Sequence, residues 1–418
     1  MDWFVPSPAV LPSTRMDLSL GLRAAMRWHQ ERVVPGVGGV LFVRQLSWAV
    51  AGLQLAGIDH GRAKDHANAI EALACKLHFV VTGDAEDAPR YKGRRRFGSE
   101  TGSRRWTYRD LAQRSNYVVQ TYRQATTRAL PLHGLGFTEG SGRFATMTLT
   151  PSGEALANAF LKQRYGRHLR HWLESWLAGK TSIDEDADTT KLCRLLAPGD
   201  ASPAERGIVA ERLRSCSELS DPEQRRRHLM DLLLRTGGDL DVHAVCEALE
   251  ARDDYGRRHA RDIRTAILFE ETRDEAVRAL SATATALVDP HAAVSADALA
   301  ANAEIAAALD AFAAASSRLL DAFRRNGEAH GDDRRFAELG TLAPADRLLG
   351  IVRCDSRILL AFDRKITGGP AFRTGFGPAD PDRTALEDED ADDTGGGALR
   401  PWRLHQFTTL VREATAHD

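Results

Sequence analysis

Hydrophobic residues recur every three or four positions along most of this chain, the spacing that places them on one face of an α-helix. The pattern predicts a mainly α fold, with strands only where apolar and polar residues alternate. Asp65 is expected to cap the third of the predicted helices. The helices run from Leu18 to Gln30, Leu41 to Ala56, Asp65 to about Val80, Tyr108 to Arg114, Tyr117 to Leu130, Phe160 to Leu177 and Pro344 to Phe362.

Part of this pattern predicts a helix-turn-helix followed by a β-hairpin. Thr107 and Asp110 have the spacing of a capping box, which opens the shorter helix, and Ser115-Asn116 makes the turn before the longer one. Beyond Pro131, the run Leu135–Thr138 faces Arg143–Leu149 across a glycine-containing turn, as in a β-hairpin.

The segment Leu149-Thr150-Pro151-Ser152-Gly153-Glu154-Ala155-Leu156 looks like the join between wing and final helix in winged-helix proteins. Together with the order of helices and hairpin, it makes residues 65–170 resemble the winged-helix superfamily. The resemblance covers about a quarter of the chain and identifies no subfamily. It implies a DNA-binding fold whose second helix enters the major groove and whose wing, carrying Arg143, contacts a minor groove or phosphate.

Composition shifts divide the chain further. We expect an N-terminal helical segment at 1–64, a winged-helix domain at 65–180, a helical domain at 189–287, a long-helix hairpin region at 290–370, an acidic disordered linker at 378–397 and an amphipathic tail at 400–415. In the hairpin region, a packing seam is formed by Leu309, Phe312, Ser316, Leu319 and Phe323.

Charge is distributed unevenly along the chain. The chain has 56 basic and 58 acidic residues, yet Arg90 to Arg128 contains eleven basic and two acidic ones, a local net charge of +9. Clustered arginines favour a phosphate backbone through charge attraction and counterion release. The alternative is a protein-docking winged helix with solvated arginines. The residues expected to contact nucleic acid are Arg94, Arg95, Arg96, Arg104, Arg105, Arg109, Gln120, Arg123, Gln124, Thr127, Arg128 and Arg143.

The C-terminal part combines eight acidic residues between Pro378 and Gly397 with an amphipathic helix from Pro401 to Ala414. Such a tethered helix either docks in a partner's groove or folds back on its own chain. The acidic linker would shield the basic stretch until nucleic acid displaces it. The residues expected to bind a partner are Trp402, Leu404, Phe407 and Leu410.

Signals for enzymatic chemistry are few. The chain has no G-x-x-x-x-G-K-[ST], G-x-S-x-G or H-E-x-x-H motif, and no metal site or cofactor is expected. The remaining enzymatic alternative is a metal-dependent nuclease that uses Asp346, Asp363 and Lys365. Five scattered cysteines without a C-x-x-C pair indicate reduced thiols, and no signal peptide or membrane span is evident, so we expect a cytoplasmic protein.

These observations favour a non-catalytic protein that binds double-stranded DNA. More than 200 residues of helical surface remain beyond the DNA-binding segment, and they are expected to dock partner proteins or a second copy. We therefore expect a subunit of a DNA-processing, chromosome-organising or phage-defence (antiviral) assembly. The competing functions are an interaction scaffold and, less favoured, the nuclease.

Overall fold

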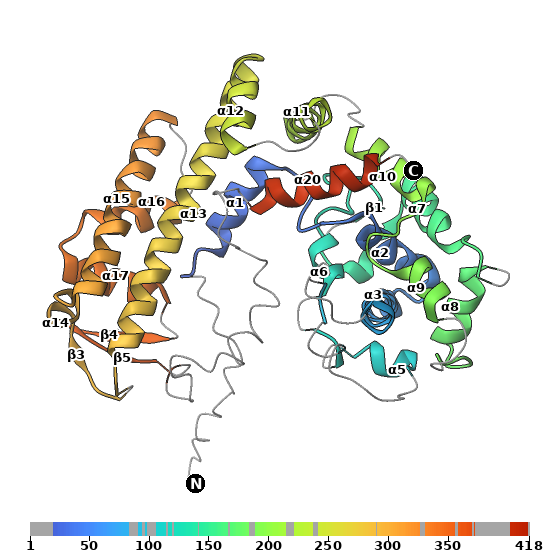
Figure 1. Cartoon of the computed structure of the whole chain (residues 1–418), viewed down its shortest axis with the longest axis horizontal. Coiled ribbons are helices and arrows are strands. Elements are labelled where there is room, and N and C mark those ends of the chain that lie inside the picture. The colour runs from blue at the N-terminus through green and yellow to red at the C-terminus, as the bar shows by residue number, and fades with distance from the viewer. Residues whose placement is uncertain are drawn as a thin grey trace, which may run out of the picture. The chain divides into compact units, whose positions relative to one another are not determined.

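The computed structural model is mainly helical, as the sequence predicts, and forms two compact units (Figure 1). Unit 1 comprises Met1–His29 and Arg264–Asp388, and unit 2 comprises Gln30–Ile263 and Glu389–Asp418. The chain passes between them within α1 (Arg23–Val33) and within α13 (Asp254–Ala286). The structure describes residues 20–82, 91–93, 97, 106–113, 116–118, 121–140, 142–165, 168–183, 189–214, 221–236, 241–289, 291–326, 331–355, 358–369, 372 and 402–416.

Unit 2 is built around α2 (Val43–Ala56) and α3 (His60–Thr82), which pack against each other. Twelve of the 14 residues of α2 are buried, as expected for a helix that is apolar on nearly every side. The other elements of unit 2 are α5 (Tyr108–Leu111), α6 (Tyr122–Thr126), β1 (Thr138–Glu139), the 3₁₀ helix η2 (Phe144–Thr146), β2 (Thr148–Leu149), α7 (Pro151–Leu161), α8 (Leu169–Leu177), α9 (Thr189–Leu196), α10 (Pro203–Arg214), α11 (Asp221–Arg235), α12 (Val242–Glu250) and α20 (Trp402–Thr415).

A buried arginine interrupts the apolar sequence of α2. The Arg44 guanidinium donates hydrogen bonds to the carbonyl oxygens of Leu195 and Asp200 and lies 3.5 Å from the buried Glu205 carboxylate. Burial lowers the pKa of Arg44, and the nearby carboxylates oppose that shift. This polar side chain therefore joins α2 to the α9–α10 connection.

Unit 1 packs helices beside a small antiparallel sheet with the strand order β3-β5-β4. The predicted seam is confirmed, because all five of its residues are buried in α15. The second part of α13 runs beside α15, where Arg318 pairs with Glu271 at 3.0 Å (Figure 1). The elements are β3 (Val294–Ser295), α14 (Ala296–Ala300), α15 (Ala303–Asn326), α16 (Gly331–Glu338), the 3₁₀ helix η3 (Leu339–Thr341), α17 (Pro344–Asp355), β4 (Leu359–Phe362) and β5 (Lys365–Gly368).

Several predicted helices are wrong at their ends. The third begins at His60 and not at Asp65. The helix expected over Phe160–Leu177 is two helices, because the Gln163 side chain donates to the carbonyl of Phe160 at the end of α7. The helix expected to reach Phe362 ends at Asp355, whose carboxylate accepts the backbone N–H groups of Ile358 and Leu359 and so directs the chain into β4.

Two further expectations concern the whole chain. The four described cysteines, Cys75, Cys193, Cys246 and Cys354, are free thiols. Among the described residues, no helix is both long enough and apolar enough to cross a membrane. Residues 184–188, between the predicted domains 65–180 and 189–287, and the predicted linker at 378–397 lie outside the described residues.

Candidate nucleic-acid interface

The predicted helix-turn-helix begins where its capping box places it. Thr107 is the N-cap of α5, and its hydroxyl accepts the backbone N–H of Asp110 at 3.3 Å. The same hydroxyl donates to the Asp110 carboxylate at 2.6 Å. The helix is shorter than predicted, because it ends at Leu111 and not at Arg114.

The second helix of the pair is much shorter than expected, and a buried glutamate explains where it starts. The Glu71 carboxylate of α3 accepts the backbone N–H of Tyr122 at 2.6 Å and that of Arg123 at 2.8 Å. These N–H groups belong to the first turn of a helix, which has no partners for them within the helix. Helix α6 therefore spans Tyr122–Thr126, and the prediction of one helix from Tyr117 to Leu130 is wrong.

Burial also changes the ionisation of Glu71. Desolvation raises the pKa of its carboxyl to about 7, against the opposing effect of the two backbone hydrogen bonds. Nearby, Tyr117 is buried, donates its hydroxyl hydrogen to Cys75 Sγ at 3.3 Å and stacks on Phe97. Tyr117 therefore belongs to the core of unit 2.

The expectation that Arg123 is exposed for contact with DNA is wrong. Its side chain is 7% exposed, its Nε donates to Asn68 Oδ1 at 2.8 Å, and its guanidinium lies over the Phe144 ring. An arginine held in this way fastens α6 and η2 to α3. It offers no charge to a phosphate backbone.

The other described residues of the predicted reading helix have intramolecular contacts. Gln124 is exposed, but its side-chain oxygen accepts the backbone N–H of Thr121 at 3.1 Å. The half-buried Thr127 donates to the carbonyl of Arg123 at 3.2 Å. Arg128 is 41% exposed and lies 3.5 Å from the Glu31 carboxylate. These contacts compete with nucleic acid at each position.

The hairpin forms between the two predicted runs, but its strands are shorter than expected. Thr138 pairs with Leu149 and Glu139 with Thr148, and η2 occupies three of the seven residues of the predicted return run. Arg143 is exposed in the connection, immediately before η2. It remains available for the predicted contact.

The helix after the hairpin starts as predicted. Thr150 is the N-cap of α7, with its hydroxyl accepting the Gly153 N–H and donating to the Gly136 carbonyl. A Cβ at Gly153 would lie 2.0 Å from the Phe137 carbonyl oxygen, so only glycine allows this close approach. The Thr150-Pro151-Ser152-Gly153 sequence thereby fixes α7 against the hairpin.

Of the twelve predicted contacts, Arg109 and Arg143 are the described arginines that are exposed as whole residues, whereas the partly exposed Arg128 side chain lies beside Glu31. Their elements, α5 and η2, both pack against α3. Six of the predicted residues lie outside the described residues, namely Arg94, Arg95, Arg96, Arg104, Arg105 and Gln120.

The predicted partner-binding tail is part of unit 2. Helix α20 packs against α10, α11 and α2, and Leu404, Phe407 and Leu410 are buried there. The expectation that these side chains bind a partner is therefore wrong, since the apolar face is satisfied within the chain. The side chain of Trp402 lies outside the described residues.

A half-buried glutamate, Glu413, holds this tail in place. Glu413 Oε2 accepts the backbone N–H of Val43, the first residue of α2, at 2.9 Å. Desolvation raises the pKa of Glu413 to about 7, while Arg44 opposes the shift. Sequence patterns gave no signal for Glu71 or Glu413, because neither stands in a recognisable motif.

The residues of the nuclease alternative are exposed at a hairpin and at a helix start. Asp363 lies in the β4–β5 turn with φ +52°, Lys365 begins β5, and Asp346 is in the first turn of α17. The Arg364 guanidinium pairs with Asp346 at 2.8 Å and with Asp297 at 2.9 Å. Among the described residues, no three His, Cys, Asp or Glu side chains are grouped as a metal site.

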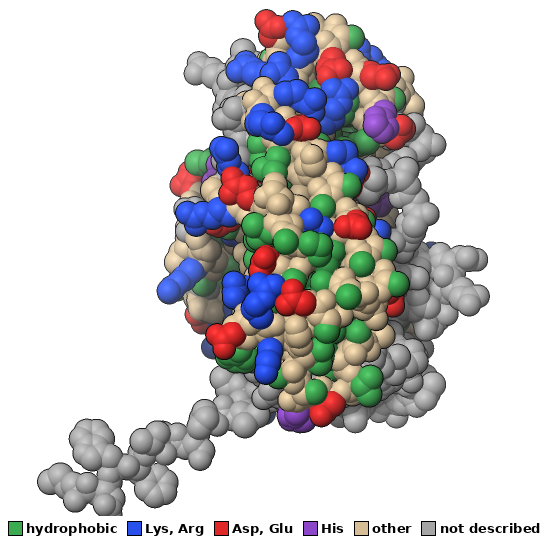
Figure 2. Space-filling model, turned by 90° about the vertical axis from the view of Figure 1, so that its left-hand side faces the viewer, with side chains coloured by type: hydrophobic (Ala, Val, Ile, Leu, Met, Phe, Trp, Pro, Cys, Tyr) green, Lys and Arg blue, Asp and Glu red, His purple; other side chains and the backbone are tan. Residues whose placement is uncertain are grey.

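Unit 1 has a mixed surface charge. Figure 2 shows positive and negative side chains interspersed on the face that includes α15. Ion pairs there include Arg318 with Glu271 and Arg324 with Asp321. Basic side chains gather toward the top of this face, with acidic ones among them.

The chain matches no protein-family model, no curated protein and no solved structure.

Proposed function

We propose that this protein binds double-stranded DNA without acting on it chemically, through a winged-helix domain in unit 2. The observation that carries the proposal is the arginine-rich stretch Arg90–Arg128, with a net charge of +9 in a nearly neutral chain. The succession of α3, α5, α6, the β1–β2 hairpin and α7 has the order of a winged helix, which supports the fold assignment.

The mode of binding that we propose differs from insertion of α6 into the major groove. Arg123 is buried and Gln124 caps its own helix, so contacts to phosphates by Arg109, Arg143 and the arginines of 94–105 are the better-supported arrangement. Phosphate contacts position a protein on DNA but do not read its sequence. We therefore propose weak sequence preference, which suits a subunit of a DNA-processing, chromosome-organising or phage-defence assembly.

A second candidate function is protein docking by the same domain. The intramolecular partners of Gln124, Thr127 and Arg128 favour it, because they occupy the side chains that a reading helix would use. The two functions differ in their response to salt. Binding through phosphates weakens steeply as salt rises, whereas a docking module shows little affinity for DNA at any salt.

The test is binding of the full chain to a random duplex across a salt series, measured by fluorescence anisotropy. We expect Arg109→Ala/Arg143→Ala to weaken binding and to reduce the slope of log K against log[salt] by about 2, since each phosphate contact contributes close to one unit. Arg278→Ala is the control, because Arg278 is an exposed arginine of unit 1 paired with Glu275. Absence of binding by the wild-type chain would refute the DNA-binding proposal and favour docking.

A further inference from the structure

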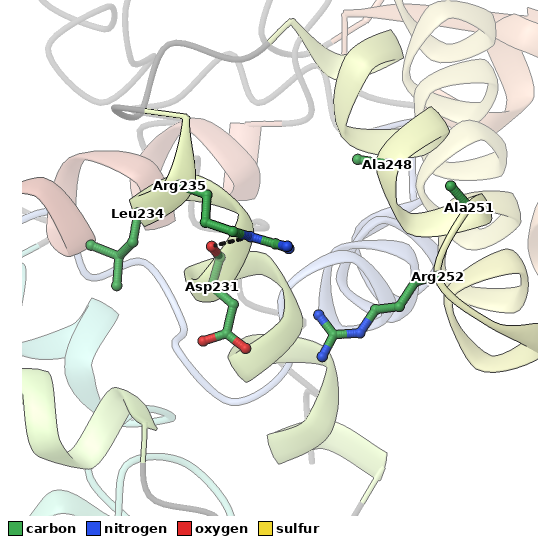
Figure 3. Close-up of a pocket in the computed structure, with 6 residues that line it drawn as sticks. All are labelled: Asp231, Leu234, Arg235, Ala248, Ala251 and Arg252. Carbon is green, nitrogen blue, oxygen red and sulfur yellow. Dashed lines mark hydrogen bonds between the residues drawn. The ribbon is translucent and has the colours of Figure 1, made fainter.

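A groove runs between α11 and α12 in unit 2 and has a volume of about 640 Å³. Figure 3 shows Arg235 of α11 and Arg252, just beyond the end of α12, extending toward one another across it. Leu234, which is 43% exposed, lies on the α11 side. The groove is lined by Asp231, Leu234, Arg235, Ala248, Ala251 and Arg252.

The lining combines positive charge with small apolar side chains. Arg235 Nε donates to the carbonyl oxygen of Asp231 at 3.1 Å, which orients its guanidinium. Among the described residues, neither Arg235 nor Arg252 forms an ion pair, although Asp231 lines the same groove. A guanidinium presents a planar fork of donors that matches a carboxylate. The groove is therefore suited to a peptide that carries carboxylates and small apolar residues.

This chain contains such a peptide, which a short tether joins to α20, a helix that packs against α11. Glu387–Asp393 has six acidic residues and one alanine, Ala391. Eight residues separate it from α20, which begins at Trp402 and packs against α11 in the same unit. Nine peptide steps span at most roughly 30 Å. A tether of this length keeps the acidic peptide at a high effective concentration beside α11.

We propose that the groove between α11 and α12 binds the acidic segment Glu387–Asp393 of the same chain. Arg235 and Arg252 pair with its carboxylates, and Ala248, Ala251 and Leu234 contact its backbone and its alanine. The proposal goes beyond DNA binding, because it assigns an intramolecular ligand to a surface that lies outside the winged-helix segment.

The test is the rate at which a glutamate-specific protease cleaves the folded full chain after Glu387 and Glu389. Docking protects both bonds, so Arg235→Glu/Arg252→Glu should raise the initial cleavage rate about three- to tenfold, as the loss of two exposed ion pairs allows. High salt should raise the wild-type rate in the same way, because it screens exposed pairs. Arg227→Glu is the matched control, since Arg227 is an exposed arginine of α11 that does not line the groove.

A reciprocal variant leaves the groove intact. Changing Asp388, Asp390, Asp392 and Asp393 to Asn keeps both glutamates as cleavage sites, and we expect the same rise in rate. Combining the two sets should give no further rise, because both remove one interaction. Cleavage at the wild-type rate in the reciprocal variant would overturn the proposal. If Arg235→Glu/Arg252→Glu loses duplex binding while its cleavage rate is unchanged, the groove binds DNA phosphates and not the acidic segment. That outcome would also overturn the proposal.

Discussion

Glu71, which is buried, and Glu413, which is half-buried, both accept backbone N–H groups at the start of a helix, but at very different sequence separations. Glu71 accepts N–H groups from α6, 51 and 52 residues away, whereas Glu413 accepts one from α2, 370 residues away. In both cases the carboxylate satisfies N–H groups that a helix start leaves without partners. The first contact shapes the candidate DNA-binding segment, and the second joins the two ends of unit 2.

The surroundings of the two carboxylates differ. Glu71 accepts two backbone hydrogen bonds, while its neighbour Arg123 is directed to Asn68. Glu413 accepts one, and its carboxylate lies in the field of Arg44, Glu205 and Arg206. A carboxylate can therefore specify a helix boundary either mainly through hydrogen bonds, as Glu71 does, or within a cluster of charged groups, as Glu413 does.

Removal of the carboxylates should show the largest difference between the two regions. Glu71→Ala leaves two buried N–H groups without an acceptor, so we expect a loss of roughly 3 to 5 kcal/mol in the free energy of unfolding. Glu413→Ala leaves one, and we expect about 2 kcal/mol. Denaturant unfolding followed by tryptophan fluorescence measures both.

The control is Glu247→Ala on the exposed surface of α12, for which a change below about 0.5 kcal/mol is expected. Equal losses for Glu71→Ala and Glu413→Ala would show that the number of N–H groups left without an acceptor does not decide the cost.

Both carboxyl groups should also make the stability of the protein depend on pH. Both pKa values are raised from 4.5 to about 7, so the folded chain binds more protons than the unfolded chain between these pH values. The stability from each carboxyl is fully present below about pH 4.5 and is lost as pH rises through 7. We expect a decrease of roughly 2 to 3 kcal/mol per carboxyl, measured by urea unfolding at pH 5 and pH 8.

Single substitutions separate the two contributions. Glu71→Gln and Glu413→Gln should each remove that residue's contribution to the decrease in the free energy of unfolding between pH 5 and pH 8. The double variant should remove both contributions. Groups near Glu71 include Lys92 and Tyr117, and those near Glu413 include Arg44 and Glu205. An unchanged slope in Glu71→Gln would mean that the Glu71 carboxyl is ionised throughout this pH range.

The sequence predicted the helical class, the cap at Thr107, the helix that follows the hairpin and the seam of α15, because each depends on neighbours within a few residues. It could not predict where α6 begins or that Arg123 is buried. Those depend on Glu71 and Asn68, which lie more than 50 residues earlier on α3. The composition of the two units likewise depends on distant contacts, since each unit combines stretches from both ends of the chain.

Substitutions of arginines in the basic stretch should change stability least, but they distinguish arginines that stabilise the fold from arginines that contact DNA. Arg123 contacts Asn68 and the Phe144 ring, so Arg123→Ala should lower the free energy of unfolding by about 1 to 3 kcal/mol. Arg109→Ala should change it by less than about 0.5 kcal/mol, because Arg109 is exposed. For DNA affinity we expect the reverse order, provided that both variants are assayed well below their melting temperatures. If Arg123→Ala is fully stable but binds DNA weakly, Arg123 contacts DNA after all. Loss of stability with retained affinity would place the binding charge on the exposed arginines around α5 and the hairpin.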